Sequence, residues 1–172
     1  VSYVGETGWE IYALTELGLN LWDLLWAAGQ EHGIIAAGMG AFETLRLEKG
    51  FLSWGIDIHT EYNPYEAGLG FAVRPNKRDF IGKKSLLQHQ EYPSQTLCYL
   101  TLNDPTAIVM GKEPVLADNK VLGYVTSAGY GYSLGRCIAY AYLPLGYSTP
   151  GTTVTIEYFD QTFAATVVEK LL

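Results

Sequence analysis

The amino-terminal segment at residues 3–10, YVGETGWE, combines residue types that suit a ligand site: an aromatic hydroxyl, two glycines and two carboxylates. Glycine tolerates backbone angles that other residues avoid, so Gly5 and Gly8 let the chain turn sharply and bring Tyr3 close to Glu10. A carboxylate binds a planar ligand edge that offers two adjacent N–H groups, such as a pterin, through paired hydrogen bonds. We therefore predict that Tyr3 and Glu10 line one ligand pocket.

Residues 9–14, WEIYAL, are expected to form the strand that positions Glu10. Strand alternation places Glu10 on one face with Tyr12 and Leu14, and because both faces are largely apolar, Glu10 is expected to be half-buried. A buried carboxylate requires hydrogen-bond donors. Its donors come either from a ligand or from the protein, through a core arginine or a backbone turn, and spacing alone leaves both interpretations open.

Other reactive side chains indicate no catalytic centre. Glu6 and Glu10 would not face each other across a turn that leads into a strand, so an acid/base pair is not expected. Arg46 lies in a predicted helix and is expected to form a structural ion pair with a loop. The three histidines share no metal-ligand spacing. Neither Cys98 nor Cys137 has a histidine or basic neighbour that would activate a thiol, so no catalytic residue and no metal site is predicted.

The glycine-rich run at residues 129–135, GYGYSLG, is one residue away from a dinucleotide-binding fingerprint. It lies between two predicted strands, with no helix to supply an amino-terminal dipole, so the motif is weak evidence for phosphate binding. Two alternatives remain for Ser127, Tyr130 and Tyr132: they contact a flat ligand, or they pack within a loop.

The composition indicates a folded chain and excludes several partners. Of the 172 residues, 48% are hydrophobic, which suffices for a substantial core. A formal net charge of −7 without a basic run argues against nucleic acid and anionic membranes as partners, and no apolar run is long enough to span a membrane. The two distant cysteines favour a reducing compartment, taken as the cytoplasm, and buried free thiols, although one disulfide stays open.

The predicted elements fall into two parts that divide at Pro93, residues 1–92 and 93–172. In the first part, helices are expected over residues 17–32, 39–49 and the segment ending near Tyr92, with short strands at 33–37 and 66–73 and a surface loop at 54–63. The first helix is expected to pack on a sheet, and the second to direct Phe42 and Leu45 inward.

The second part changes to short strands separated by turn residues. Turns are expected at residues 118–119 and 160–161. The fold class is therefore α+β, ending in a small antiparallel β-barrel. The predicted strands are Thr96–Leu102, Pro114–Leu116, Val121–Ser127, Arg136–Leu143, Thr153–Phe159 and Phe163–Val168.

Several motifs, in this order, resemble the aminomethyltransferase (glycine-cleavage T-protein) family, and within it the carboxy-terminal folate-binding region of dimethylglycine oxidase and sarcosine dehydrogenase. They are YVGETGWE at 3–10, FETLRLEKG at 42–50, SWG at 53–55, EAGLGF at 66–71, FIGK at 80–83 and GYVTS at 123–127. The resemblance implies that residues 1–92 are the later part of an α/β folate-binding domain and that the rest is the carboxy-terminal barrel. Phe42 stands where glycine-cleavage enzymes have an arginine, which favours the oxidase-like branch.

The resemblance also implies a function. Tyr3 and Glu10 would contact the pterin of tetrahydrofolate, and the parent protein would transfer a one-carbon unit from an N-methyl amine to it. The family's catalytic aspartate would lie upstream, as would an FAD domain, so we expect a piece of a longer polypeptide whose partners are folate and its own upstream domains. The alternatives are a glycine-cleavage T-protein, a folate-dependent demethylase, or a noncatalytic binding or regulatory module of the same fold.

Overall fold

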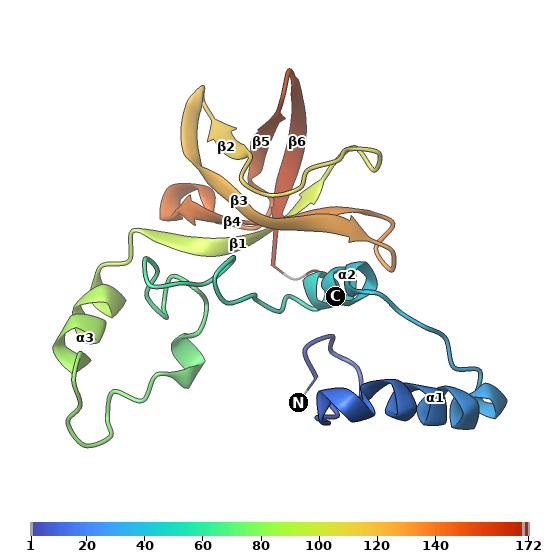
Figure 1. Ribbon diagram of the computed structural model, residues 1–172. Coiled ribbons are helices and arrows are strands. Elements are labelled where there is room, and N and C mark those ends of the chain that lie inside the picture. Colours follow the sequence, from blue (N-terminus) through green and yellow to red (C-terminus); the bar gives the residue numbers. More distant parts are fainter. Residues whose placement is uncertain (1, 170, 172) are drawn as a thin grey trace.

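Antiparallel strands close into a barrel in the computed structural model, which describes residues 2–169 and 171 (Figure 1). The strands are β1 (Gln95–Leu102), β2 (Pro114–Ala117), β3 (Lys120–Gly131), β4 (Arg136–Pro144), β5 (Thr153–Tyr158) and β6 (Gln161–Val168). Their order around the barrel is β1-β4-β3-β2-β5-β6, and β6 pairs back onto β1. The predicted small antiparallel barrel is confirmed, and each predicted strand overlaps an observed one.

Two-residue turns join the β2–β3 and β5–β6 hairpins of the barrel. Asp118 and Asn119 connect β2 to β3 with φ angles of 51° and 58°, the left-handed conformation that asparagine and aspartate tolerate well. The second turn begins one residue earlier than predicted, because Gln161 already pairs with Tyr158 at the start of β6. Phe159 consequently takes the left-handed position, with a φ of 52°.

Strand β4 is buried on both faces, which explains its pattern of small and large residues. Its inward side chains, which include Ala139 and Ala141, belong to the barrel core. Its outward side chains include Ile138 and Tyr140, which belong to a second apolar cluster with Leu47. Small residues fill the narrow interior, whereas the large outward residues provide a surface on which the amino-terminal half docks.

Both cysteines are free and buried in the barrel core, at 5% exposure for Cys98 and 3% for Cys137. The prediction that the two thiols pack as small apolar groups is confirmed. Burial raises the pKa of Cys98 to about 11, and it also raises the pKa of Cys137.

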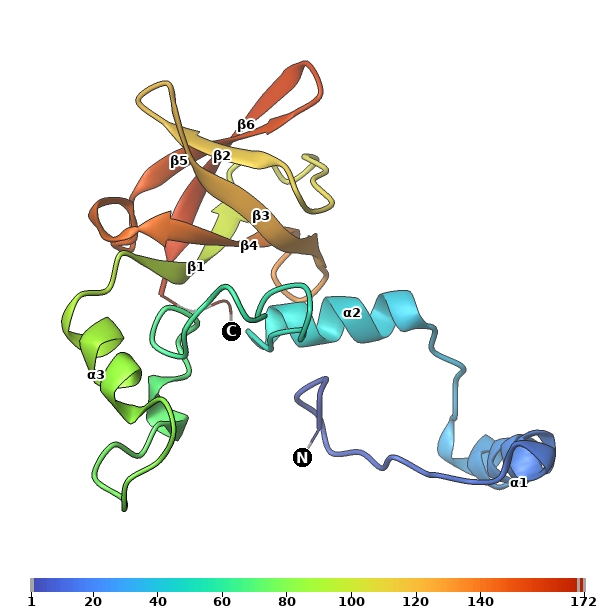
Figure 2. The same cartoon turned by 60° about the vertical axis from the view of Figure 1, so that its left-hand side comes forward.

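In the described part of the chain, three α-helices precede the barrel: α1 (Gly18–Gly29), α2 (Met39–Glu48) and α3 (Lys83–Glu91). All lie within predicted helices or one residue from them. Figures 1 and 2 show that α1 stands apart from the barrel, and none of its residues is buried. The prediction that this helix packs on a sheet is wrong for the described residues, because the sheet they form lies elsewhere. None of the described helices is long and apolar enough to cross a membrane.

Helix α2 docks on the barrel through a face that differs from the predicted one. Phe42 and Leu45 each remain 37% exposed, whereas Arg46, Leu47 and Glu48 are each 2% exposed. The expected inward direction of Phe42 and Leu45 is therefore wrong. Polar groups on the barrel surface provide hydrogen-bond partners for the two charged side chains, so burying them carries a smaller desolvation penalty.

The three short strands predicted in the amino-terminal half do not form. Residues 8–14 and 34–38 are irregular and exposed, and residues 66–73 form turns and the 3-10 segment Gly70–Ala72. A strand needs a neighbour for its backbone N–H and C=O groups, and no described strand lies beside these segments. Residues 54–63 form a loop as predicted, but Asp57 within it is fully buried. The predicted division at Pro93 falls between α3 and β1 and stays a prediction.

Candidate functional site

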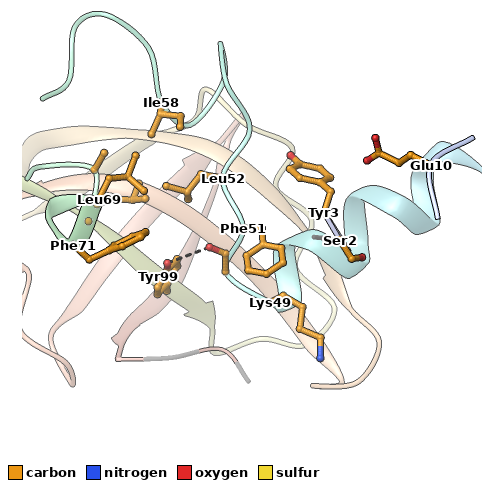
Figure 3. A pocket seen from close by; sticks show the side chains of 14 residues that line it. Ser2, Tyr3, Glu10, Lys49, Phe51, Leu52, Ile58, Leu69, Phe71 and Tyr99 are labelled. Carbon is orange, nitrogen blue, oxygen red and sulfur yellow. Dashed lines mark hydrogen bonds between the residues drawn. The ribbon is translucent and has the colours of Figure 1, made fainter. Parts of the chain in front are cut away.

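A cavity of about 850 Å³ lies where the amino-terminal turn, the segment after α2 and strand β1 meet (Figure 3). We call it the amino-terminal cavity. Its volume lies within the range typical of small-molecule sites. Its lining residues are Ser2, Tyr3, Glu10, Lys49, Gly50, Phe51, Leu52, Ile58, Ala67, Gly68, Leu69, Phe71, Leu97 and Tyr99. Both of the main predicted ligand-binding residues, Tyr3 and Glu10, are among them.

The amino-terminal turn is held against α2 and its carboxy-terminal end. The Tyr3 ring stacks on Phe42 with 5.1 Å between ring centroids. Glu6 pairs with Lys49 at 3.4 Å, an exposed ion pair. Gly5 has a φ of 75°, and a Cβ at this position would clash with the Lys49 side chain. Two motifs that are far apart in sequence, YVGETG and LRLEKG, therefore form one edge of the cavity, and Gly5 permits their close approach.

Glu10 lies at the rim of the amino-terminal cavity and is exposed, so its expected half-burial is wrong. The reason is the missing strand at residues 9–14, which would have placed Glu10 against a sheet. Its Oε2 accepts a hydrogen bond of 2.8 Å from the Tyr12 hydroxyl, and this bond raises the pKa of Tyr12. The remaining acceptor positions of the Glu10 carboxylate are open to donors from a ligand.

The wall opposite is apolar and aromatic. Figure 3 places Phe71 and Leu69 across the cavity from Tyr3 and Glu10, with Phe51 below Tyr3. Phe71 is 78% exposed and Phe51 is 39% exposed, so both rings offer surface to a ligand. Flat rings of this kind stack well on a planar ligand.

Strand β1 of the barrel contributes Leu97 and Tyr99 to the same cavity. The Tyr99 hydroxyl donates a hydrogen bond of 3.3 Å to the carbonyl of Gly50, drawn as the dashed line in Figure 3. Burial raises the pKa of Tyr99, which keeps the phenol protonated as a donor. Sequence reasoning missed Tyr99; its only sequence signal is an outward position on a strand whose inward residues are apolar.

Behind the cavity wall lies a buried ion pair between Arg46 of α2 and Asp57 of the following loop. Arg46 Nη1 lies 2.7 Å from Asp57 Oδ2, and Arg46 Nε lies 2.6 Å from Glu43 Oε2. Burial by itself lowers the pKa of Arg46, but Asp57 and Glu43 raise it overall, so the guanidinium stays charged. The prediction that Arg46 forms an ion pair with a loop is confirmed.

The other predicted ligand contacts lie elsewhere. Ser127 is buried on β3, where its hydroxyl accepts a hydrogen bond of 2.9 Å from Arg46 Nη2. Tyr130 lies near the carboxy-terminal end of β3 and packs edge-on against Tyr132, with 5.1 Å between ring centroids. Tyr130 borders a separate cavity of about 330 Å³. None of these three residues lines the amino-terminal cavity.

The described residues of the amino-terminal cavity form a candidate binding site that contains no cysteine. Both thiols are buried in the barrel, and no group of three or more histidine, cysteine, aspartate or glutamate side chains within residues 2–169 and 171 could hold a metal ion. The arrangement suits a flat ligand with an apolar ring face and an N–H edge. Aromatic rings would contact the face, and Glu10 would accept hydrogen bonds from the edge.

The fold thus places a cavity, which is a candidate ligand site, between the amino-terminal helices and loops and a closed barrel. Two family models match this chain: the GCVT N-terminal domain over residues 1–77, and the glycine cleavage T-protein C-terminal barrel domain over residues 95–172. The chain belongs to the aminomethyltransferase (glycine-cleavage T-protein) family, as the sequence motifs predicted.

The curated relatives include dimethylglycine dehydrogenases and aminomethyltransferases. Human mitochondrial dimethylglycine dehydrogenase is 38% identical over all of this chain and 20% of its own length. The aminomethyltransferase of Symbiobacterium thermophilum is 38% identical over 98% of this chain and 45% of its own length. A crystal structure of the glycine cleavage system aminomethyltransferase T from Bartonella henselae has a TM-score of 0.80 and 27% identity, covering 91% of this chain and 44% of that one. The chain thus spans about a fifth of the dehydrogenase and less than half of the aminomethyltransferases.

Proposed function

We propose that this chain forms part of a tetrahydrofolate site in a protein that transfers one-carbon units from an N-methyl amine of the dimethylglycine or sarcosine type. The observation that carries the proposal is that Tyr3 and Glu10, the two residues implied by the family resemblance, line one cavity together with exposed aromatic rings. Family membership supports the class of activity, and the match to dimethylglycine dehydrogenase supports the class of amine.

The residues of the cavity fit a reduced pterin. A pterin has a flat bicyclic face, which suits the rings of Tyr3, Phe51 and Phe71. Its amino-pyrimidine edge presents adjacent N–H groups, which suit the carboxylate of Glu10. Lys49 lies on the same lining and offers a cation for an anionic part of the ligand. The site thus combines ring contacts with a small number of orienting polar groups, as small-molecule sites generally do.

The role of this chain in such a reaction is to bind and orient. Tetrahydrofolate would supply the amine that accepts the one-carbon unit. Glu10 would fix the in-plane orientation of the pterin, and Tyr3 would fix the position of the ring. The apolar wall at Leu52, Leu69 and Leu97 would exclude water from one side of the ligand. The catalytic aspartate and the FAD domain that the resemblance implies are expected in other parts of a longer polypeptide.

Phe42 supports the oxidase-like branch of the family. Its ring stacks on Tyr3, so an aromatic residue at position 42 helps to hold the turn that carries the predicted pterin contacts. The resemblance places an arginine at this position in glycine-cleavage enzymes, where the contact with Tyr3 would have a different character. A glycine-cleavage T-protein is the second candidate, because aminomethyltransferases also match nearly the whole chain. The compartment stays a prediction, and the mammalian dimethylglycine dehydrogenases are mitochondrial proteins.

A calorimetric titration tests the proposal. 5-Formyltetrahydrofolate, a stable reduced folate, is titrated into the full-length polypeptide and into its Glu10→Ala variant. We expect saturable binding that the substitution weakens by roughly 1.5–3 kcal/mol, the contribution of a charge-assisted hydrogen-bond pair, or at least about tenfold in Kd.

Glu157→Gln is the matched control, because Glu157 is an exposed carboxylate of strand β5 that does not line the cavity. Its Kd is expected to stay within about twofold of the wild-type value. Absence of binding to the wild-type protein would contradict the proposed function. Equal binding by wild type and Glu10→Ala would leave folate binding in place and remove Glu10 from the site.

A further inference from the structure

The buried side chain of Asp57 is one of the groups that tie the wall of the amino-terminal cavity to the barrel. This wall segment runs from Lys49 through Leu52, and Ile58 returns to the cavity after a tight loop. The loop closes on itself, because the Asp57 and Ile58 amides both donate to the carbonyl of Ser53, at 2.9 and 3.2 Å. Interactions that hold Asp57 in place therefore also hold the two parts of the wall, residues 49–52 before the loop and Ile58 after it.

The Asp57 carboxylate is 0% exposed and has donors on both oxygens. Oδ2 accepts from Arg46 Nη1 at 2.7 Å and from the Ser53 amide at 2.9 Å. Oδ1 accepts from the Thr126 hydroxyl at 2.6 Å. One donor comes from α2, one from the loop and one from strand β3, so the carboxylate joins α2 and its following loop to a strand that is distant in sequence.

The backbone of the same segment is held from the barrel side. The Tyr142 hydroxyl of β4 donates to the Asp57 carbonyl at 2.8 Å, and the Tyr140 hydroxyl donates to the Leu47 carbonyl at 2.6 Å. Tyr99 of β1 donates to Gly50, as described above. Arg46 Nη1 also donates to the carbonyl of Phe51 at 3.0 Å. The outward tyrosines of the barrel thus contact the backbone that carries the cavity wall.

We propose that Asp57 is a positioning residue for the amino-terminal cavity: it transmits the fixed geometry of the barrel to the wall formed by Phe51, Leu52 and Ile58. The inference rests on the proposed function for the identity of the ligand. Asp57 does not line the cavity, so its effect on a ligand passes through Ile58, the next residue, and through Arg46, which holds Phe51.

A second tether between α2 and the barrel distinguishes positioning from general stability. Glu48 accepts hydrogen bonds from the Ser133 amide at 2.6 Å and from the Ser133 hydroxyl at 2.9 Å. It also joins α2 to the barrel, but it leads to the turn after β3, which contributes no residue to the cavity. Loss of one hydroxyl at Ser133 should weaken the docking of α2 without moving the cavity wall. Loss of one hydroxyl beside Asp57 should do both.

The test compares Thr126→Val and Tyr142→Phe with the control Ser133→Ala, in the full-length polypeptide. Each substitution removes one hydroxyl and keeps most of the side-chain volume. The first two are expected to raise the Kd for 5-formyltetrahydrofolate by roughly three- to tenfold, because a mobile wall must be ordered at the cost of binding free energy. Ser133→Ala is expected to lower Tm with a Kd within about twofold of wild type. Thr126→Ser, which restores the hydroxyl, is expected to recover wild-type affinity.

Hydrogen exchange of the free protein provides a readout that needs no folate. Thr126→Val and Tyr142→Phe should accelerate exchange at the amides of Gly55, Asp57 and Ile58, and Ser133→Ala should not. Unchanged exchange at these amides would overturn the inference even if the wild-type protein binds no folate. If the wild-type protein does bind folate, equal Kd values for all variants would also overturn the inference. So would a loss of folate affinity in Ser133→Ala as large as that in Thr126→Val. Either result would leave the proposed function standing.

Discussion

Asp57→Ala should destabilise the protein far more than the loss of any exposed ion pair. The substitution would leave the Arg46 guanidinium, only 2% exposed, without its fully buried partner. It would also leave the Ser53 amide and the Thr126 hydroxyl without the acceptor that each now contacts. Removing one partner of a buried pair costs about 3–5 kcal/mol of unfolding free energy, and the remaining, 43% exposed partner Glu43 offsets part of that cost.

The coupling free energy between substitutions at Asp57 and Arg46 separates this explanation from simple loss of packing. Arg46→Met should also destabilise, because it leaves the Asp57 carboxylate with two of its three donors. In the double variant no charge remains buried without a partner, so its cost should fall below the sum of the two single costs by about 2 kcal/mol or more.

Urea unfolding, followed by far-UV circular dichroism and by tryptophan fluorescence, measures these free energies. The slopes with urea must agree among the variants for the comparison to hold. Glu6→Gln is the control, because it breaks the exposed pair with Lys49 and should change the unfolding free energy by less than about 1 kcal/mol. The reasoning is refuted if Asp57→Ala lies within about 1 kcal/mol of wild type, or if the two single costs add within about 0.5 kcal/mol.

Two further predictions concern alkaline pH and the amino-terminal turn. Burial raises the pKa of Cys98 from 9.0 to about 11, so between these pH values the folded chain keeps a proton that the unfolded chain releases. The contribution of Cys98 to the unfolding free energy is therefore fully present below pH 9. It declines as pH rises through 11, by up to about 1.4 kcal/mol per pH unit. Urea titrations across this range should show that decline, and Cys98→Ala should make it shallower; a stability that rises with pH would contradict the assignment. Gly5→Ala should raise the Kd for 5-formyltetrahydrofolate, because a Cβ at a φ of 75° clashes with Lys49 and displaces Tyr3, whereas Gly8→Ala, whose Cβ would meet little, should leave the Kd near wild type. Equal Kd values for the two glycine variants would show that the turn does not hold Tyr3 through this contact.

The barrel was predictable because its signals are local. Alternating residues in 95–168, interrupted by turn-forming residues, define each strand from its own sequence, and closure of the barrel gives every strand two neighbours. The same local logic predicted the three helices and the buried, free thiols of Cys98 and Cys137. The convergence of Tyr3 and Glu10 on one cavity followed from the glycines between them and from the family motifs.

The tertiary structure decided what local patterns cannot contain. A strand at residues 9–14 requires a neighbouring strand, and none of the described strands lies there, so Glu10 became an exposed rim residue. The buried face of α2 was set by its partners on the barrel. Ser127 forms a hydrogen bond with Arg46 and Ser133 forms one with Glu48, whereas Phe42 stays partly exposed. The sequence determined the helices and the six barrel strands, and it indicated Tyr3 and Glu10 as candidate ligand contacts. Only the fold decided which charges are buried, because the burial of a charge depends on donors and acceptors supplied by residues that are distant along the chain.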